Sequence, residues 1–312
     1  MRLLAFLVRR VGSGALTVFA VASLCFFALH ALPGDPVDVL LDETATGAER
    51  AALRSALRLD RSLPAQYAGF VIDLVARGMG RSFVHPERTA LAEVWRVWPS
   101  TATLAVAAML VAWCVAIPAA VLAATRPGTR TDAAVGVGSL VGMALPSVWV
   151  GPMLVLVFCV GLGVLPFPGP DATGVGSLVL PAVTLGAGMA GILTRMGRAA
   201  LRDVLREPYV AAARAKGLSE PVVLVKHALR SALVPLLTVG GAQLSALLGG
   251  AVVTERVFER EGLGSLFLES LLRRDVPVAL ACVVAVAVTV VVVQLAVDLA
   301  YALIDPRIRV EA

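Results

Sequence analysis

The sequence predicts an all-α membrane protein with six transmembrane helices, and two observations carry this prediction. Hydrophobic residues make up 58% of the 312-residue chain and charged residues only 16%, whereas a soluble domain is near half apolar and a quarter charged. Six windows contain no Asp, Glu, Lys or Arg: residues 11–32, 99–125, 133–170, 172–194, 231–253 and 276–297. Because a helix needs about 20 apolar residues to cross a bilayer, each window is long enough for one span. The third is long enough for one helix plus an apolar loop.

The distribution of basic residues predicts that both termini are cytoplasmic (N-in, C-in). Short loops rich in Lys and Arg stay in the cytoplasm, whereas long segments are largely exempt from this rule. With the N-terminus inside, 15 basic and 7 acidic residues lie inside, and the short outside loop 162–178 has no basic residue. The formal net charge of +5 therefore follows from the topology, and we expect no nucleic-acid partner.

Residues 1–32 are expected to form the N-terminus and the first span. This window is longer than a typical signal-peptide h-region, and the LPGDP that follows is not a small-residue cleavage site. We therefore expect an uncleaved span.

Residues 33–98 are expected to form an external helical segment. Thr46 and Glu49 have the spacing of a capping box ahead of a periodic stretch. Leu63–Pro64 breaks that pattern, and a second amphipathic helix follows, ended by Gly78 and Gly80. The sequence leaves open whether the segment covers the ends of the spans or contacts an external partner.

Residues 99–312 hold the other five spans, and the polar stretch 195–230 separates the fourth from the fifth. Glu207–Pro208 restarts the chain, and AAARAK follows as a helix of small side chains that Gly217 can end in a left-handed conformation. Ser219-Glu220-Pro221 then predicts a new helix with a capping hydroxyl and an early proline. The composition predicts helix, tight turn, helix at the cytoplasmic surface. It fits either a docking surface for a partner or a plain re-entry loop.

Motifs for chemistry are absent from the sequence or better explained by packing. GAGMAG at 186–191 fits G-x-G-x-x-G, but it lies inside an apolar run without the strand and acid that a nucleotide site needs. We expect it to allow close helix packing, as we expect of Gly138 and Gly142. The chain has no G-x-x-x-x-G-K-[S/T] motif, so we expect no ATP site. The scattered histidines and cysteines predict no metal or other cofactor site, and we name no catalytic residue.

Several segments resemble the permease subunits of binding-protein-dependent ABC importers of the oligopeptide/dipeptide/nickel class. AAARAKG at 211–217 is similar to the coupling motif of that family, although Ala211 stands where the family has glutamate. LPGDP at 32–36 and RLDRSLPAQY at 58–67 are similar to its external segment, in which Met79 stands where an acidic residue is usual. Further similar stretches are ALPSVWVG at 144–151, VTERVFEREGLGSLFLESLLRRDVPV at 253–278 and VDLAYALIDPRIR at 297–309.

The resemblance covers nearly the whole chain and implies a B-type permease subunit in the cell membrane. The implied partners are a second homologous permease subunit, two ATP-binding-cassette ATPase subunits, an extracytoplasmic substrate-binding protein and membrane lipid. ATP and magnesium would be bound by the ATPases. The implied contact with them is a coupling helix made of Ala211, Ala212, Ala213, Arg214, Ala215, Lys216 and Gly217.

The resemblance implies transport of small peptides by alternating access, with a chelated-nickel importer of the same class as the alternative. A stand-alone ion-coupled carrier would show polar or charged residues at mid-membrane and inverted repeats, neither of which is evident. An intramembrane enzyme would need paired catalytic groups at bilayer depth, and His30 has no evident partner. The residues that line the translocation path are not identified.

Overall fold

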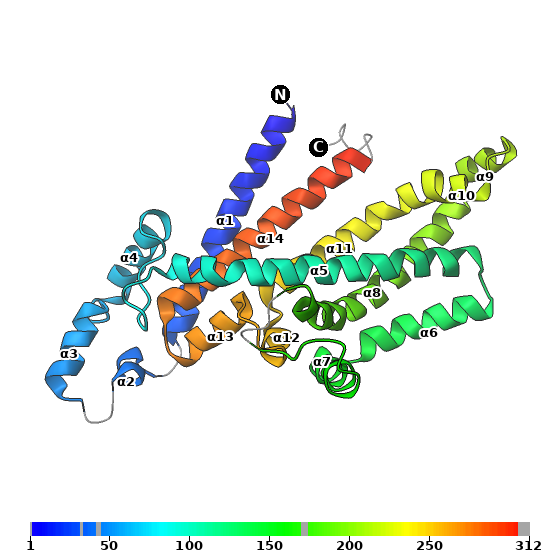
Figure 1. Cartoon of the computed structure of the whole chain (residues 1–312). Coiled ribbons are helices and arrows are strands. Elements are labelled where there is room, and N and C mark those ends of the chain that lie inside the picture. The colour runs from blue at the N-terminus through cyan, green and yellow to red at the C-terminus, as the bar shows by residue number, and fades with distance from the viewer. Residues whose placement is uncertain (1, 32–33, 42–44, 170–173, 305–312) are drawn as a thin grey trace. The chain divides into compact units, whose positions relative to one another are not determined.

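A computed structural model describes residues 2–31, 34–41, 45–169 and 174–304 of the chain (Figure 1). Regular structure in these ranges is helical, apart from one isolated antiparallel bridge between Arg81 and Thr89. The α-helices are α1 (Arg2–Ala31), α2 (Pro36–Leu40), α3 (Gly47–Ala56), α4 (Leu63–Ala76), α5 (Ala90–Thr125), α6 (Arg130–Ala144), α7 (Ser147–Val155), α8 (Gly176–Leu205), α9 (Pro208–Ala215), α10 (Glu220–Val222), α11 (Arg230–Gly250), α12 (Val252–Val257), α13 (Leu263–Leu272) and α14 (Val276–Ile304). Two π-helical stretches, η1 (Leu156–Gly161) and η2 (Val223–Leu229), continue α7 and α10.

The described helices agree with the predicted membrane spans in five places. Five of them are long and apolar enough to cross a membrane: Val8–Ala31, Ala90–Thr125, Gly176–Leu205, Glu220–Gly249 and Val276–Tyr301. The third charge-free window forms a bent pair instead, Arg130–Ala144 and Ser147–Gly161, with an angle of 98° between the two parts. All-helical architecture is therefore confirmed, and the count of six spans holds if the bent pair crosses as one.

The bend in the third window has a local cause at Leu145–Pro146. A residue that precedes proline is disfavoured in the helical conformation, and Leu145 is extended with φ −76° and ψ 120°. Pro146 then takes the N-cap position of α7. We expected one helix and an apolar loop, but residues 147–161 form a second helical arm because the apolar run continues after the proline.

The chain divides into two compact units, and α5 and α14 each contribute residues to both. The first unit holds Met1–Thr101 with Glu261–Val291, and the second holds Ala102–Arg260 with Val292–Ala312.

In the first unit, aromatic side chains pack α4 against the end of α1. Phe26 stacks on Phe70 with ring centroids 5.1 Å apart and meets Tyr67 edge-on at 5.3 Å. Tyr67 also hydrogen-bonds Ser23 through the two hydroxyls, 2.8 Å apart. The segment after the first span is thus held to that span by a buried aromatic cluster, where aromatic pairs add stability beyond burial alone.

The helices of this segment begin close to where the sequence predicts. Thr46 and Glu49 form the predicted capping box ahead of α3, and two hydrogen bonds from Thr46 lower the pKa of the Glu49 carboxyl. Leu63 and Pro64 start α4. They were predicted as a break, and they fit because proline is pre-organised for a first helical turn. The α5 helix begins at Ala90, ahead of its charge-free window, where the Thr89 hydroxyl accepts a hydrogen bond from the Ala92 amide at 3.2 Å.

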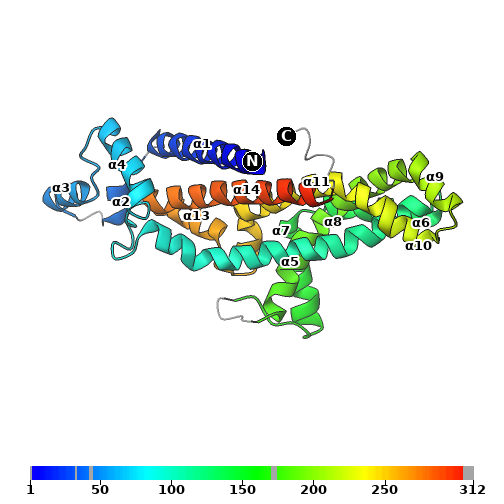
Figure 2. The ribbon, with the colours of Figure 1, turned by 90° about the horizontal axis from the view of Figure 1, so that it is seen from above.

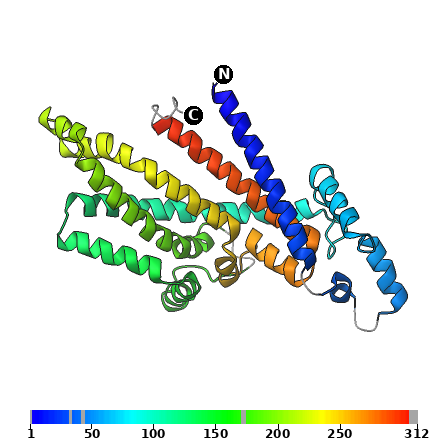
Figure 3. The ribbon, with the colours of Figure 1, turned by 180° about the vertical axis from the view of Figure 1, so that it is seen from behind.

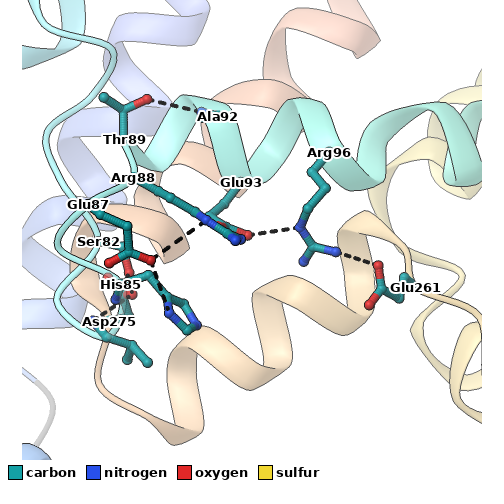
Figure 4. A network of polar contacts seen from close by, with 11 residues as sticks. Ser82, His85, Glu87, Arg88, Thr89, Ala92, Glu93, Arg96, Glu261 and Asp275 are labelled. Atoms are coloured by element: carbon teal, nitrogen blue, oxygen red, sulfur yellow. Dashed lines mark hydrogen bonds and ion pairs between the residues drawn. The ribbon is translucent and has the colours of Figure 1, made fainter.

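Figure 4 shows a polar network that ties the 82–96 stretch to the chain around Glu261 and Asp275. The buried carboxylate of Glu93 forms ion pairs with Arg88 and Arg96, with nitrogen–oxygen distances of 2.8 and 3.1 Å. Arg96 also pairs with Glu261. Asp275 is buried as well and accepts hydrogen bonds from the hydroxyl of Ser82 and the amide of Phe83. Two buried carboxylates therefore fix how α5 and α14 begin, which is possible because each carboxylate is paired or hydrogen-bonded.

In the second unit, α8 is the central helix and its glycines allow close contact with three neighbours. A Cβ atom at Gly191 would lie 2.5 Å from the Ser139 carbonyl of α6, and one at Gly186 would lie 2.8 Å from the Ala108 carbonyl of α5. At Gly197 the nearest atoms belong to Ala120 of α5 and Leu236 of α11. Figures 1 and 3 show α6 and α8 running side by side. The predicted packing role of GAGMAG is confirmed.

The paired glycines of α6 behave differently from each other. A Cβ at Gly142 would lie 3.0 Å from the Ala187 carbonyl of α8, whereas one at Gly138 would meet nothing within 4 Å. Only Gly142 therefore serves the predicted close approach.

Candidate functional site

The candidate site is the turn between α9 and α10, which the sequence places between the fourth and fifth spans. Glu207 is extended with φ −68° and ψ 143°, and Pro208 starts α9 as predicted. The helix ends in a Schellman motif, in which the Gly217 amide bonds the Arg214 carbonyl at 2.9 Å and the Leu218 amide bonds the Ala213 carbonyl at 3.4 Å. Gly217 has a φ of +77°. The predicted left-handed glycine is confirmed.

The start of the second helix differs from the prediction in one respect. Ser219 takes the N-cap position and Pro221 the early position, but the serine hydroxyl makes no cap hydrogen bond. The Ser219 carbonyl accepts a hydrogen bond from the Val223 amide at 3.0 Å instead. The prediction of a capping hydroxyl is therefore wrong, although the helix boundary is right.

One face of α9 is buried within the chain itself. Val210 and Ala213 pack against Val223 of η2, and all three are nearly inaccessible to solvent. The other residues of the predicted coupling set lie on the exposed side: Ala211, Ala212, Arg214, Ala215, Lys216 and Gly217. Ala213 thus lies on the buried face of α9, whereas the remaining alanines form an exposed surface of small side chains.

Arg214 bridges the turn. Its guanidinium donates to both carboxylate oxygens of Glu220, with nitrogen–oxygen distances of 2.7 to 3.1 Å. Such a two-point pair fixes orientation as well as charge, and its hydrogen bonds raise the pKa of Arg214. The sequence interpretation gave Arg214 a role toward a partner, but here the side chain holds α9 to α10. Tyr209 adds a second tie through a 3.0 Å hydrogen bond to Ser231 of α11.

A cluster around Asp132 supports the base of the site, and the sequence reading did not single it out. The Asp132 carboxylate is buried and receives Arg198 through two hydrogen bonds of 2.6 and 2.9 Å, and Arg202 through one of 2.7 Å. The Gly128 amide adds a fourth donor at 3.0 Å. Figure 2 shows that the start of α6 lies at the same end of this unit as α9 and α10. The cluster therefore joins the loop after α5 to the part of α8 that leads into α9.

A signal for this cluster exists in the sequence, but it is weak. Asp132 is the acid that follows the charge-free second window, and Arg198 and Arg202 lie four residues apart on one helix face. Nothing in the spacing tells which arginines a distant acid will meet, so the pairing appears only in three dimensions.

The exposed face of α9 provides a contact surface that can bind another protein chain. Small side chains on α9 permit close approach of another backbone, and Lys216 supplies an exposed charge at its edge. Within the described ranges, no group of three or more His, Cys, Asp or Glu is placed to hold a metal ion.

Comparison with known proteins identifies the family. A model described as binding-protein-dependent transport system inner membrane component matches residues 116–310, and a model of the N-terminal part of the same component matches residues 3–105. The chain is 37% identical over 338 aligned positions to the di/tripeptide transport system permease protein DppB of Pseudomonas aeruginosa (strain UCBPP-PA14), covering 98% of this chain and 99% of the relative. It is 35% identical to the oligopeptide transport system permease protein AppB of Bacillus subtilis (strain 168), with the same shares covered.

A solved structure shows the same fold at lower sequence similarity. The inward-facing MetNI methionine ABC transporter has a TM-score of 0.52 at 22% identity, and the superposition covers 68% of this chain and 96% of that one. Two family models that together span most of the chain, and relatives above 30% identity that match it almost from end to end, agree with its apolar helices. The chain therefore belongs to the family of inner membrane components of binding-protein-dependent transport systems and is a multi-pass protein of the cell membrane.

Proposed function

We propose that this chain is the permease subunit of an ATP-driven importer that carries dipeptides and oligopeptides across the cell membrane. The observation that carries the proposal is the similarity, over 98% of the chain, to relatives named as di/tripeptide and oligopeptide permeases. The coupling to ATP hydrolysis takes place through separate ATPase subunits, which bind ATP and magnesium. A second homologous permease completes the path, and an extracytoplasmic binding protein delivers the peptide.

The exposed face of α9 is the proposed contact with an ATPase subunit. Three alanines, Ala211, Ala212 and Ala215, leave this face without bulky side chains. On the opposite face of the helix, Val210 and Ala213 pack against Val223. A helix that is held rigidly transmits motion better than a loose loop. The hydrogen bonds from Arg214 to Glu220 and from Tyr209 to Ser231 hold α9 in this way. Arg214 contributes here by its bond to Glu220, and Lys216 and Gly217 lie at the exposed end of the same face.

The proposed mechanism is alternating access with both termini in the cytoplasm. This orientation is predicted from the excess of basic residues in the inside segments, and it would put α9 and its ATPase on the cytoplasmic side. Closure of the ATPase pair would move α9, and the bundle would exchange inward-facing and outward-facing states. Such an exchange is driven only by contacts that differ between the two states, which the α9 surface can supply.

Purification of the chain with its natural partners tests the proposal. We would tag the full chain at its C-terminus, solubilise native membranes in mild detergent and identify the proteins that copurify in stoichiometric amounts. A second permease of similar size with one or two P-loop ATPases is the expected result. A chain that purifies alone or as a homo-oligomer in several mild detergents would contradict it and favour a stand-alone carrier.

A charge on the exposed face of α9 should release the ATPases. In Ala212→Glu the new carboxylate cannot be accommodated against a closely packed partner, so we expect the ATPases to be lost while the permease pair remains. Ala199→Glu on α8 is the matched control, because Ala199 is an exposed alanine of the same polar stretch outside α9. Ala213→Glu is a poor test, since Ala213 is buried. Equal ATPase recovery from both variants would refute docking through α9.

The substrate is tested by uptake in cells that express the complete transporter. Labelled dipeptides, tripeptides and longer peptides should accumulate in an ATP-dependent manner, and chelated nickel should not compete. Strong competition by the nickel chelate together with weak peptide uptake would assign the chain to the nickel branch instead. It would leave docking through α9 intact, because the two results concern different parts of the chain.

A further inference from the structure

A cavity of about 680 Å³ lies within the first unit. The apolar part of its lining, called the floor below, includes Phe26 of α1, Phe70 of α4 and Leu280 of α14. The walls come from the chain between α3 and α4 and from the 77–89 stretch. The stacking of Phe26 on Phe70 fixes α1 and α4 relative to each other, so the cavity is built into the unit.

The mouth of this cavity carries an excess of positive charge. Arg58, Arg61, Arg77 and Arg81 line it, with Asp73 as the acid among the lining residues. The Asp73 carboxylate lies 3.8 Å from both Arg58 and Arg77, which is longer than a hydrogen bond. Arg58 and Arg77 therefore keep donors free for another oxyanion. Guanidinium groups match the geometry of phosphate and carboxylate oxygens through paired N–H donors.

The cavity lies at the ends of three helices that are long and apolar enough to cross a membrane. His30 is in the last turn of α1, Val276 begins α14, and Thr89 directly precedes α5; all three line the cavity. The α5 helix has 36 residues and is about 54 Å long, against about 30 Å of hydrocarbon. Because Glu93 and Arg96 lie on its first turns, we expect these turns to extend beyond the bilayer core. Trp95 and Trp98 follow on those turns and pack edge to face, as tryptophans do at membrane interfaces.

Two non-glycine residues around the mouth have left-handed backbone conformations, which are rare for residues other than glycine. Arg58 has φ +59° and Met79 has φ +65°, although neither is glycine. Such left-handed residues are uncommon and tend to occur where a site demands them. Arg58 ends α3 in this way, which turns the chain that follows along the cavity wall.

We propose that this cavity binds the phosphodiester headgroup of an anionic phospholipid. The arginines of the mouth take the phosphate oxygens, and the apolar floor covers the glycerol and the first methylene groups of the lipid. The apolar floor distinguishes this ligand from free inorganic phosphate, which would leave the floor without a partner. Binding of anionic lipid does not depend on the direction in which the chain threads the membrane, because such lipid can be supplied to either leaflet.

Titration of the full chain, purified with its partners, tests this site by counting bound molecules in native mass spectrometry. The probes are dioctanoyl phosphatidylglycerol, dioctanoyl phosphatidylcholine, inorganic phosphate and dialanine. We expect phosphatidylglycerol to bind at least about tenfold more tightly than the others. Loss of two arginine contacts in Arg58→Gln/Arg61→Gln should weaken its binding roughly 30-fold, at about 1 kcal/mol per contact. Arg50→Gln is the control, since Arg50 is on α3, pairs with Asp38 and does not line the cavity.

A second variant fills the cavity without changing any charge. Gly69 of α4 lines the cavity, and a Cβ added there meets nothing within 4 Å. Gly69→Leu should therefore abolish binding of phosphatidylglycerol while the protein keeps its thermal midpoint. Gly47→Leu is its control, because Gly47 also has open space around it but lies outside the cavity.

Three results would overturn the proposal. Equal affinity for phosphatidylcholine would remove the role of the anionic headgroup. Equal affinity for inorganic phosphate or dialanine would assign the cavity to a soluble anion. Unchanged lipid binding in the well-folded Gly69→Leu variant would place the lipid elsewhere on the chain.

Discussion

Asp132 gathers four hydrogen-bond donors around one buried carboxylate in the second unit. Its carboxylate receives two arginines and one backbone amide while lying buried at the start of α6. A buried carboxylate is tolerated only when such partners replace water. The same residue anchors the helix start, since the Thr129 hydroxyl accepts a hydrogen bond from the Asp132 amide.

Asp132→Asn should lower the thermal midpoint of the purified protein by several degrees. The amide has nearly the same shape, but it leaves Arg198 and Arg202 close together without the charge that balances them, and breaking a buried pair is more costly than never forming it. Differential scanning fluorimetry in detergent measures the change. Arg195→Gln is the control, because Arg195 is exposed on the same helix outside the cluster. An equal midpoint for the two variants would show that the cluster contributes nothing to stability.

At the scale of single residues, the sequence could predict types and roles but could not predict partners. Gly217 was predicted as a left-handed helix end because glycine alone adopts that conformation freely, and it has φ +77°. Arg214 could not be assigned in this way. Whether its side chain faces a partner subunit or Glu220 depends on the angle between α9 and α10, which no local pattern encodes.

Among the helices, α8 depends most on small residues. The backbone carbonyls of α5 and α6 approach two of its glycines, Gly186 and Gly191, so closely that neither has room for a methyl group. Hydrophobic driving force between helices is weak in lipid, so close van der Waals contact of this kind carries much of the association.

Gly191→Ala should destabilise the protein, whereas Gly138→Ala should be nearly neutral. The added methyl group at Gly191 would lie 2.5 Å from the Ser139 carbonyl, but at Gly138 it would meet nothing within 4 Å. Overpacking of a helix contact costs about 1–3 kcal/mol. The thermal midpoints of the two variants in the same detergent provide the comparison. Equal midpoints would mean that α6 and α8 can separate without cost.

The arms of the third window show where element-scale prediction stops. The proline at position 146 is visible in the sequence and predicts a break before it. The 98° angle between the two arms is not visible there. That angle depends on how α7 packs against α8 and α12, and these contacts join residues far apart in the chain.

For the whole molecule, the predicted threading has a direct test. In a variant without the four native cysteines, Glu87→Cys should react with a membrane-impermeant maleimide on intact cells, because Glu87 is exposed in the segment that is predicted to be external. Lys216→Cys should react only after the membrane is opened. The opposite pattern would invert the orientation and place α9 outside, where no ATPase could reach it.

The sequence by itself determined the membrane class, the places of five long helices and the turn between α9 and α10. These features follow from apolar runs long enough for a bilayer and from glycine, proline and capping residues, which act on their immediate neighbours. Only the tertiary structure decided that Ala213 is buried, that Asp132 meets Arg198 and that four arginines gather at one cavity. Each of these depends on helices packing at particular rotations and depths, and a side chain meets its distant neighbours only after that packing is complete.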